Sequence, residues 1–199
     1  PAFLFYLTDF ADLPVGERAL ASLFQAVTPR TAGYNTVDLT KMSDTSQAVT
    51  ILLMLTGGAP GSTAGGMKVT TLAVLIANAA AVFHRREDSR LFDRRLDYSA
   101  VRNAAAILLL YLSLTFVGAA VISEVEGLPL GACLYETASA AGTVGLTLGL
   151  TPQLGTLSQS ILILLMFFGR VGGLTLIYAA FSGHDLTYAR YPKEMITVG

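Results

Sequence analysis

Two short glycine-containing stretches carry the residues best suited to chemistry in this sequence. The first reads Thr31-Ala32-Gly33-Tyr34, and the second reads Thr143-Val144-Gly145-Leu146. Glycine adopts backbone conformations with positive φ, which can turn successive carbonyl oxygens toward one axis. Rings of such carbonyls can replace the hydration water of a cation in a narrow filter, and a threonine hydroxyl supplies a further oxygen. We therefore predict that the carbonyls of both stretches coordinate dehydrated K⁺.

These two stretches, called filter loops 1 and 2 below, belong to segments that repeat at an offset of 112 positions. The matching pairs are Thr31 and Thr143, Gly33 and Gly145, Ala26 and Ala138, Met54 and Met166, and Gly57 and Gly169. Each loop follows a short helical segment, 17–28 or 130–141. A segment of about 12 residues is too short to span a bilayer and suits a re-entrant helix. An external loop with glycine turns would explain one stretch alone, whereas the repeat favours two helix–pore-loop–helix units around a central site.

The composition is that of a membrane protein. Hydrophobic residues make up 53% of the 199 residues and charged residues 14%, whereas a soluble domain carries about 25% charged residues. Crossing a bilayer takes about 20 mostly apolar residues, and the runs 104–123 and 157–182 reach this length. The run 47–83 is also long enough but is interrupted by glycines. We expect an all-α, multi-pass membrane protein that contacts the lipid bilayer.

The interruption holds a second candidate site. Positions 57–66 contain five glycines and a proline, which do not sustain a helix. We expect a loop near the middle of the membrane that lines a cavity, because lipid cannot satisfy its backbone polar groups. The alternative is a short linker outside the membrane. The residues of the predicted loop are Gly57, Gly58, Gly61, Ser62, Thr63, Gly65, Gly66 and the following Lys68.

Arg170 is an unexpected charge inside the apolar run 157–182. An arginine near the bilayer centre costs about 2.5–3.5 kcal/mol on insertion scales, so its side chain should face protein or water. It could raise the barrier for a passing cation, or anchor the glycine-rich loop through that loop's carbonyls. The remaining alternative is a structural arginine that pairs with an acidic group.

The distribution of positive charge predicts the orientation in the membrane. Six arginines lie between positions 85 and 102, whereas positions 103–169 hold no Lys or Arg. Because positively charged loops stay on the cytoplasmic side, we place the loop 84–103 and the C-terminus in the cytoplasm, in a plasma-membrane protein. The apolar end, 195–199, is expected to contact a dimer partner, although most termini fray.

Other classes of function fit the sequence poorly. The segment Gly61-Ser62-Thr63 could be mistaken for a serine nucleophile, which would need a base within hydrogen-bond reach. Both histidines, His84 and His184, fall at expected cytoplasmic helix ends. A single cysteine excludes an internal disulfide and a Cys-rich metal site. The sequence has no cluster of basic residues interleaved with aromatic residues, which would indicate nucleic-acid binding. We expect neither an enzyme nor a resident cofactor. A purely structural subunit would have no use for paired filter loops.

Taken together, these motifs resemble the Trk/Ktr/HKT superfamily of cation transporters, and most closely the membrane subunit of its bacterial Ktr branch. The matching segments are 31–36, 57–68, 143–146 and 169–173, and the Gly-Ser-Thr loop followed by Lys68 is the most specific of them. The resemblance implies four helix–pore-loop–helix repeats around one pore. It maps positions 1–90 to the third repeat, with most of its first helix missing. Positions 91–199 map to a cytoplasmic linker, the complete fourth repeat and a tail.

The resemblance also implies roles for single residues. Thr31, Ala32, Gly33, Tyr34, Thr143, Val144, Gly145 and Leu146 would contribute to the selectivity filter, and the loop from Gly57 to Lys68 would be a gate with Arg170 beside it. Members assemble as homodimers, and bacterial members bind a cytoplasmic nucleotide-binding ring. The superfamily divides over sodium, so Na⁺ as an activator, as a coupled ion or as the conducted ion stays open.

Overall fold

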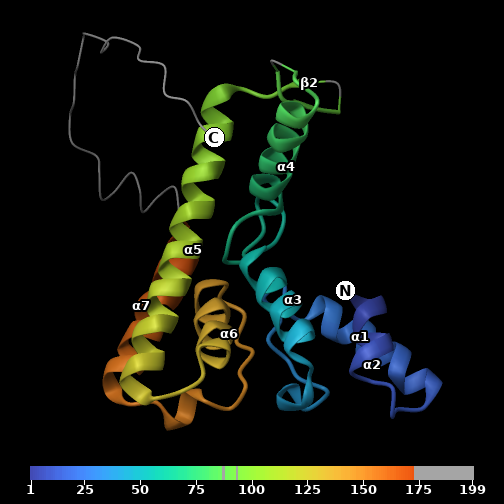
Figure 1. The fold of residues 1–199 in the computed structure, drawn as a ribbon, viewed down its shortest axis with the longest axis vertical. Coiled ribbons are helices and arrows are strands. Elements are labelled where there is room, and N and C mark those ends of the chain that lie inside the picture. The colour runs from blue at the N-terminus through green and yellow to red at the C-terminus, as the bar shows by residue number, and fades with distance from the viewer. Residues whose placement is uncertain (87, 93, 173–199) are drawn as a thin grey trace.

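The computed structural model describes residues 1–86, 88–92 and 94–172, and this part of the chain is largely helical (Figure 1). Its elements are α1 Ala2–Thr8, α2 Val15–Val27, the 3₁₀ helix η1 Leu39–Lys41, α3 Asp44–Leu55, α4 Val69–Phe83, β1 Arg90–Leu91, β2 Arg94–Arg95, α5 Tyr98–Glu126, α6 Leu130–Ala141, η2 Thr151–Gln153 and α7 Thr156–Val171. Among the described helices, only α5 is long and apolar enough to cross a bilayer by itself.

Several helices have the positions that the sequence predicts. Helix α6 has the predicted bounds 130–141, and α2 matches the segment 17–28 within two residues. Local signals set other ends. Ser43 caps α3 by accepting a hydrogen bond from the amide of Ser46 at 3.3 Å. Helix α5 ends at Gly127, whose φ of 65° is a conformation that glycine adopts readily.

The order of elements recurs at the offset seen in the sequence. η1 begins at Leu39 and η2 at Thr151, and α3 begins at Asp44 and α7 at Thr156, so both pairs are 112 positions apart. A carboxylate binds the backbone amide of the residue that precedes α3 and of the residue that precedes α7. Asp9 accepts from the Ser43 amide at 2.7 Å, and Glu126 accepts from the Gly155 amide at 2.8 Å. The two segments therefore share helix starts and a capping device.

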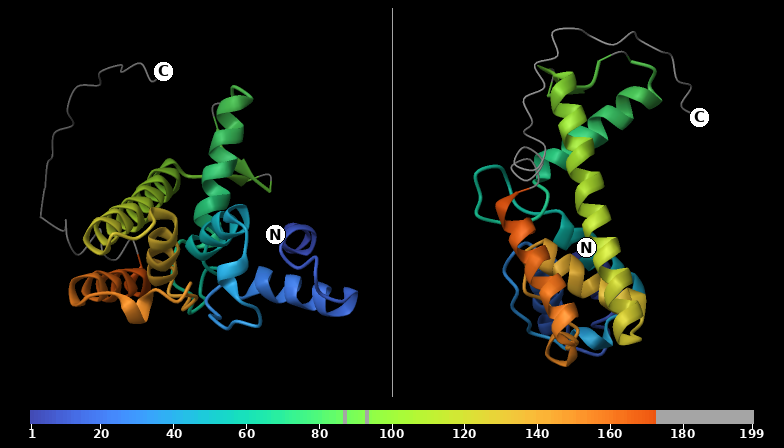
Figure 2. Two further views of the ribbon diagram at one scale, coloured as in Figure 1. Left: turned by 60° about the horizontal axis from the view of Figure 1, so that its bottom comes forward. Right: turned by 90° about the vertical axis from the view of Figure 1, so that its left-hand side faces the viewer.

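Helix α6 is the centre of the packing. It contacts α3, α5 and α7, and it lies between these helices in both views of Figure 2. Most of its residues are buried, including Tyr135 and Ala138, which have no exposed surface. A methyl group on Gly118 would lie 3.1 Å from Leu165 Cδ1, which shows how closely α5 approaches α7 there. Small residues at such contacts let membrane helices pack tightly.

Two sequence-based boundaries were wrong. The run 157–182 does not form one continuous helix, because α7 ends at Val171 and Gly172 has a φ of 90°. Arg170 therefore lies in the last turn of α7 rather than midway along a helix. Helix α5 begins at Tyr98, so the predicted loop 84–103 is shorter at its C-terminal end.

That loop also contains a small hairpin. Strands β1 and β2 pair antiparallel, with Arg90 opposite Arg95 and Leu91 opposite Arg94. The predicted division between 90 and 91 falls inside β1. Residues 173–199, which include the tail that we expect at a dimer interface, lie outside the described residues.

Candidate ion-conducting site

Both filter loops have the same unusual backbone. In filter loop 1 the φ angles of Thr31 and Gly33 are 68° and 72°, and in filter loop 2 those of Thr143 and Gly145 are 52° and 93°. A non-glycine residue with positive φ is uncommon. Such conformations cost of order 1–3 kcal/mol each and persist where the surroundings enforce them, often at functional sites. Both loops therefore have the same strained conformation, with positive φ at alternate residues, and their surroundings must enforce it.

The two filter loops lie against each other. A Cβ atom built on Gly33 would lie 2.2 Å from the carbonyl oxygen of Val144 and 3.4 Å from the Cα of Gly145. An ordinary side chain at position 33 would therefore collide with filter loop 2. The chain brings together two loops that are 112 residues apart, as the sequence-based hypothesis of a shared site requires.

Each loop is held by a side chain from the helix before it. In filter loop 1 the hydroxyl of Thr28 donates to the carbonyl oxygen of Tyr34 at 2.7 Å. In filter loop 2 the amide of Gly145 donates to the hydroxyl oxygen of Ser139 at 3.2 Å. The supports occupy different positions, so the loops share a conformation but not the contacts that maintain it.

Glu136, on α6, braces the segment that follows filter loop 2. Its carboxylate accepts hydrogen bonds from the Thr147 hydroxyl at 2.6 Å, the Leu148 amide at 2.9 Å and the Thr151 hydroxyl at 2.6 Å. The side chain is only 4% exposed. Glu136 belongs to none of the motifs that predicted the site, although an acidic side chain inside a short apolar helix is a signal for a functional position.

The filter threonines line a cavity of about 640 Å³, together with Ser139, Met166 and Arg170. The hydroxyl oxygens of Thr31 and Thr143 are both buried and have no hydrogen-bond partner among the described residues. A buried polar group without a partner costs free energy. These two oxygens are thus available to a ligand that enters the cavity, and a cation suits them because hydroxyl oxygens have lone pairs.

The glycine-rich loop between α3 and α4 is more ordered than its sequence predicts. Backbone hydrogen bonds close its base: the Gly57 amide donates to the Met67 carbonyl at 2.6 Å, and the Val69 amide donates to the Gly58 carbonyl at 3.1 Å. The Lys68 ammonium group donates to the carbonyl oxygen of Ala64 at 2.6 Å and to that of Ser62 at 3.2 Å. Residues 59–63 form an exposed tip. The loop holds no helix at positions 57–66, as the sequence predicts, and its backbone hydrogen bonds to the flanking residues lie at its base.

The same loop meets both filter loop 2 and α7. A Cβ atom on Gly65 would lie 2.2 Å from the Thr143 hydroxyl oxygen. Arg170 donates a hydrogen bond from Nη1 to the carbonyl oxygen of Thr63. The described part of the chain shows no ion pair for Arg170, so its contact there is the loop backbone rather than an acidic group. The structure thus brings filter loop 2, the glycine-rich loop and Arg170 into one site.

Some predicted site residues lie less close to this centre. Tyr34 is 73% exposed, whereas the corresponding Leu146 is 1% exposed. A Cβ atom built on Gly61, at the exposed tip of the loop, would meet no atom within 4 Å. The filter residues of loop 2 are therefore more enclosed than those of loop 1.

Comparisons with known proteins place the chain in a family. A family profile described as TrkH, cation transport protein, matches residues 2–185. The chain is 37% identical over 187 residues to the Ktr system potassium uptake protein B of Bacillus subtilis, covering 94% of this chain and 42% of that protein. It is 39% identical over 189 residues to the potassium/sodium uptake protein NtpJ of Enterococcus hirae, covering 92% of this chain and 42% of that protein.

The fold is also that of a solved transporter. The crystal structure of the potassium transporter TrkH from Vibrio parahaemolyticus matches with a TM-score of 0.72 at 21% identity, over 89% of this chain and 40% of the other. The chain thus spans about two-fifths of the length of the relatives it matches. These matches confirm the resemblance seen in the motifs, and the chain belongs to the TrkH family of membrane-embedded cation transport proteins.

Proposed function

We propose that this chain forms part of the ion pathway of a potassium uptake protein. The observation that carries the proposal is the pair of filter loops with the same positive-φ pattern, which lie against each other. Beside them are two threonine hydroxyls that have no hydrogen-bond partner in the described part of the chain. Backbone carbonyls of residues 31–34 and 143–146 would replace the hydration shell of K⁺. The printed name of the Bacillus relative, a potassium uptake protein, supports this choice of ion.

The two helix–loop–helix segments would be the third and fourth of four repeats around one pore. The shared offset of elements and the coverage of about two-fifths of the relatives support this assignment. Two further filter loops would then come from the rest of the full-length protein. Residues 1–90 and 91–199 would be the two repeat units, with the hairpin between α4 and α5 in the cytoplasm.

The glycine-rich loop would be the gate. It lies against Thr143 of filter loop 2, and its tip is tied to Arg170 by a single described hydrogen bond. Breaking that bond would free the tip from α7, while the bond from Lys68 to Ser62 and the backbone pairs at the base would still hold the loop together. Loops with few packing contacts are the kind of element that switching transitions use.

The active assembly would be a homodimer with a cytoplasmic nucleotide-binding ring as its regulatory partner. The Bacillus relative is named as a component of a Ktr system, which supports a second subunit. Opening would follow when the ring displaces the glycine-rich loop from the pathway.

The test is ion flux through the full-length protein. Purified protein in vesicles, with its cytoplasmic partner bound, should take up ⁸⁶Rb⁺ down its gradient, and external K⁺ should compete better than Na⁺. Protein-free vesicles give the leak, and a variant with both Gly33→Ser and Gly145→Ser should still take up ⁸⁶Rb⁺ but with a weaker preference for K⁺. Uptake equal to protein-free vesicles, in protein shown to be folded and correctly inserted, would refute a transport role.

A sodium-conducting or sodium-coupled protein is the second candidate, because the Enterococcus relative is named a potassium/sodium uptake protein. The same vesicles separate the alternatives. Equal competition by Na⁺ and K⁺ indicates a non-selective filter, and ⁸⁶Rb⁺ uptake that requires external Na⁺ indicates activation or coupling.

A further inference from the structure

A groove of about 420 Å³ lies between helix α4 and the β1–β2 hairpin, at the end of the molecule away from α6 (Figure 1). Its floor is formed by Ala73, Ile76, Ala77 and Ala80, which are three or four residues apart and so share one face of α4. Three of these side chains are single methyl groups, which makes the floor a shallow apolar channel along the helix.

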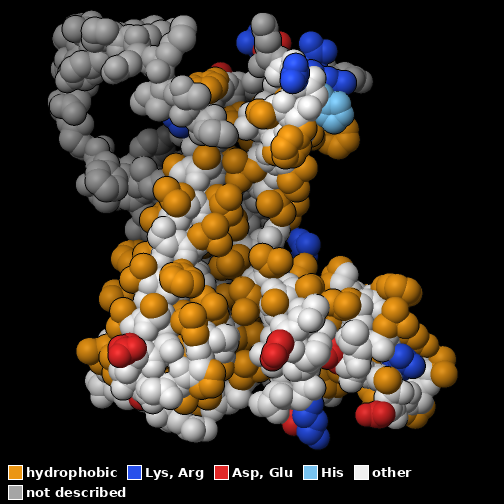
Figure 3. All heavy atoms as spheres, viewed as in Figure 1, with side chains coloured by type: hydrophobic (Ala, Val, Ile, Leu, Met, Phe, Trp, Pro, Cys, Tyr) orange, Lys and Arg blue, Asp and Glu red, His pale blue; other side chains and the backbone are white. Residues whose placement is uncertain are grey.

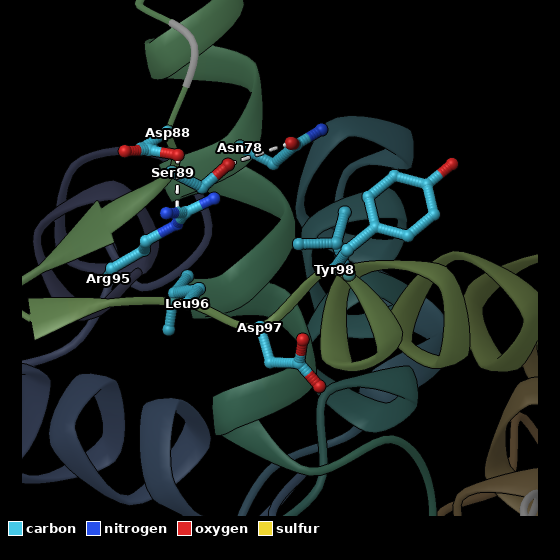
Figure 4. A pocket seen from close by; sticks show the side chains of 8 residues that line it. Asn78, Asp88, Ser89, Arg95, Leu96, Asp97 and Tyr98 are labelled. Carbon is cyan, nitrogen blue, oxygen red and sulfur yellow. Dashed lines mark hydrogen bonds and ion pairs between the residues drawn. The ribbon is translucent and has the colours of Figure 1, made fainter.

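The rim of the groove is basic. Among the described residues, His84, Arg86 and Arg90 line it, together with the acidic Asp88. The Asp88 carboxylate is already engaged, because its Oδ1 lies 2.9 Å from Nε of Arg95, which faces the neighbouring pocket (Figure 4). The charge that the described rim offers to a ligand is therefore positive.

The rim is held in place over the floor. Ser89 donates a hydrogen bond from its hydroxyl to Asn78 Oδ1 at 2.9 Å, which fastens the hairpin to α4 (Figure 4). The Arg86 amide donates to the Ala81 carbonyl at 2.9 Å, and the pairing of Arg90 with Arg95 fixes the start of the hairpin. A preformed site avoids part of the ordering cost of binding.

The groove also lies where a membrane surface should be. Helix α5, which packs beside α4, has the length and hydropathy of a membrane span, and it begins directly after the hairpin. Phe83, Phe92 and Tyr98 are 83%, 91% and 78% exposed around this end of the helices. Of these, Tyr98 at the start of α5 is of a type that is enriched at the bilayer interface. Figure 3 shows basic side chains gathered at this end, above helices covered by hydrophobic side chains.

From these observations we propose that the groove binds one anionic phospholipid. Arg86 and Arg90 hold the phosphate of the headgroup, and one acyl chain lies along the alanine face of α4. Basic pockets at helix ends bind anionic headgroups in this manner. A water-soluble partner protein fits less well, because the floor is apolar and runs along a helix toward the hydrocarbon. The proposal does not depend on which ion the protein conducts.

The test measures retention of phosphatidylglycerol by the full-length protein, with phosphatidylcholine as the neutral reference, by native mass spectrometry and by titration in nanodiscs. The double variant Arg86→Gln/Arg90→Gln should bind phosphatidylglycerol roughly 30-fold more weakly, since each basic residue near a membrane surface contributes about a fivefold gain. The pair Arg85→Gln/Arg94→Gln removes the same charge from residues that do not line the groove, and it should change binding about threefold or less.

A second variant tests the floor without changing charge. Ala80→Leu fills the channel and should also displace phosphatidylglycerol, while size-exclusion profiles and ⁸⁶Rb⁺ flux show that each variant is folded. If both double arginine variants lose phosphatidylglycerol binding equally, the attraction to anionic lipid is diffuse, and the proposed lipid site is refuted. Retention unchanged by Ala80→Leu would overturn the proposed acyl-chain position. Unchanged lipid retention with loss of the cytoplasmic subunit would assign the rim to a protein partner instead.

Discussion

Replacing Gly33 by serine should damage ion selectivity more than the same change at Gly145. Both glycines have positive φ, so either substitution places a side chain in a strained backbone, at a cost of about 1–3 kcal/mol. Only Gly33 meets a second obstacle, because its Cβ would lie 2.2 Å from the Val144 carbonyl oxygen. A Cβ at Gly145 meets nothing closer than 3.8 Å.

The Cβ of residue 33 and the carbonyl oxygen of Val144, 2.2 Å apart, must separate by roughly 1.3 Å or more to reach an ordinary contact. The Val144 carbonyl is a proposed ligand of K⁺, so this movement alters the filter itself. We expect Gly33→Ser to reduce the preference for K⁺ over Na⁺ about tenfold or more, equivalent to about 1.4 kcal/mol of discrimination. Gly145→Ser should reduce it several-fold less.

Competition by Na⁺ and K⁺ against ⁸⁶Rb⁺ uptake by full-length protein in vesicles measures both effects. Gly16→Ser, in an open position on α2, controls for the substitution itself. Wild-type selectivity in both filter variants would refute the filter assignment. A larger effect at Gly145 than at Gly33 would refute the reasoning from the contact with Val144.

Four further predictions concern the gate, the brace and the tail. Arg170→Ala should raise ⁸⁶Rb⁺ flux without the cytoplasmic partner, because it removes the hydrogen bond to Thr63. The flux of Arg170→Lys should lie between those of wild type and Arg170→Ala. Flux no higher than wild type in folded protein would argue against a tether. Deleting 59–63 should act in the same direction while the hydrogen-bonded base holds the ends of the loop together, and a silent but folded variant would contradict this. Glu136→Gln should weaken the preference for K⁺ over Na⁺, since a charged acceptor contributes about 1.5–3 kcal/mol per hydrogen bond. Glu136→Asp should restore part of this preference. Unchanged selectivity with a lowered melting temperature would indicate a purely structural brace. Deleting 195–199 should dissociate a dimer in detergent, as light scattering would detect, and an intact dimer would exclude the tail from the interface.

Much of the architecture follows from local sequence signals. The small apolar residues between Pro129 and Gly142 indicated a short helix with the bounds that α6 has. The 112-residue offset predicted that the two filter loops are equivalent, and their φ angles agree. Helix starts, glycine positions and apolar length are properties of a few neighbouring residues, and such properties are visible in a single sequence.

Contacts between distant segments needed the tertiary structure. The continuous apolar run 157–182 concealed the end of α7 at Val171, because hydropathy averages over a window and does not register one glycine with positive φ. The brace from Glu136, the contact of Gly33 with Val144 and the bond from Arg170 to Thr63 join groups that lie 11 to 111 positions apart. The sequence alone pointed to two glycine-containing loops as candidate cation ligands and to the segment 57–66 as a break in the helix. Tertiary packing decided which groups meet, because hydrogen bonds and steric contacts depend on ångström distances that residue types do not encode.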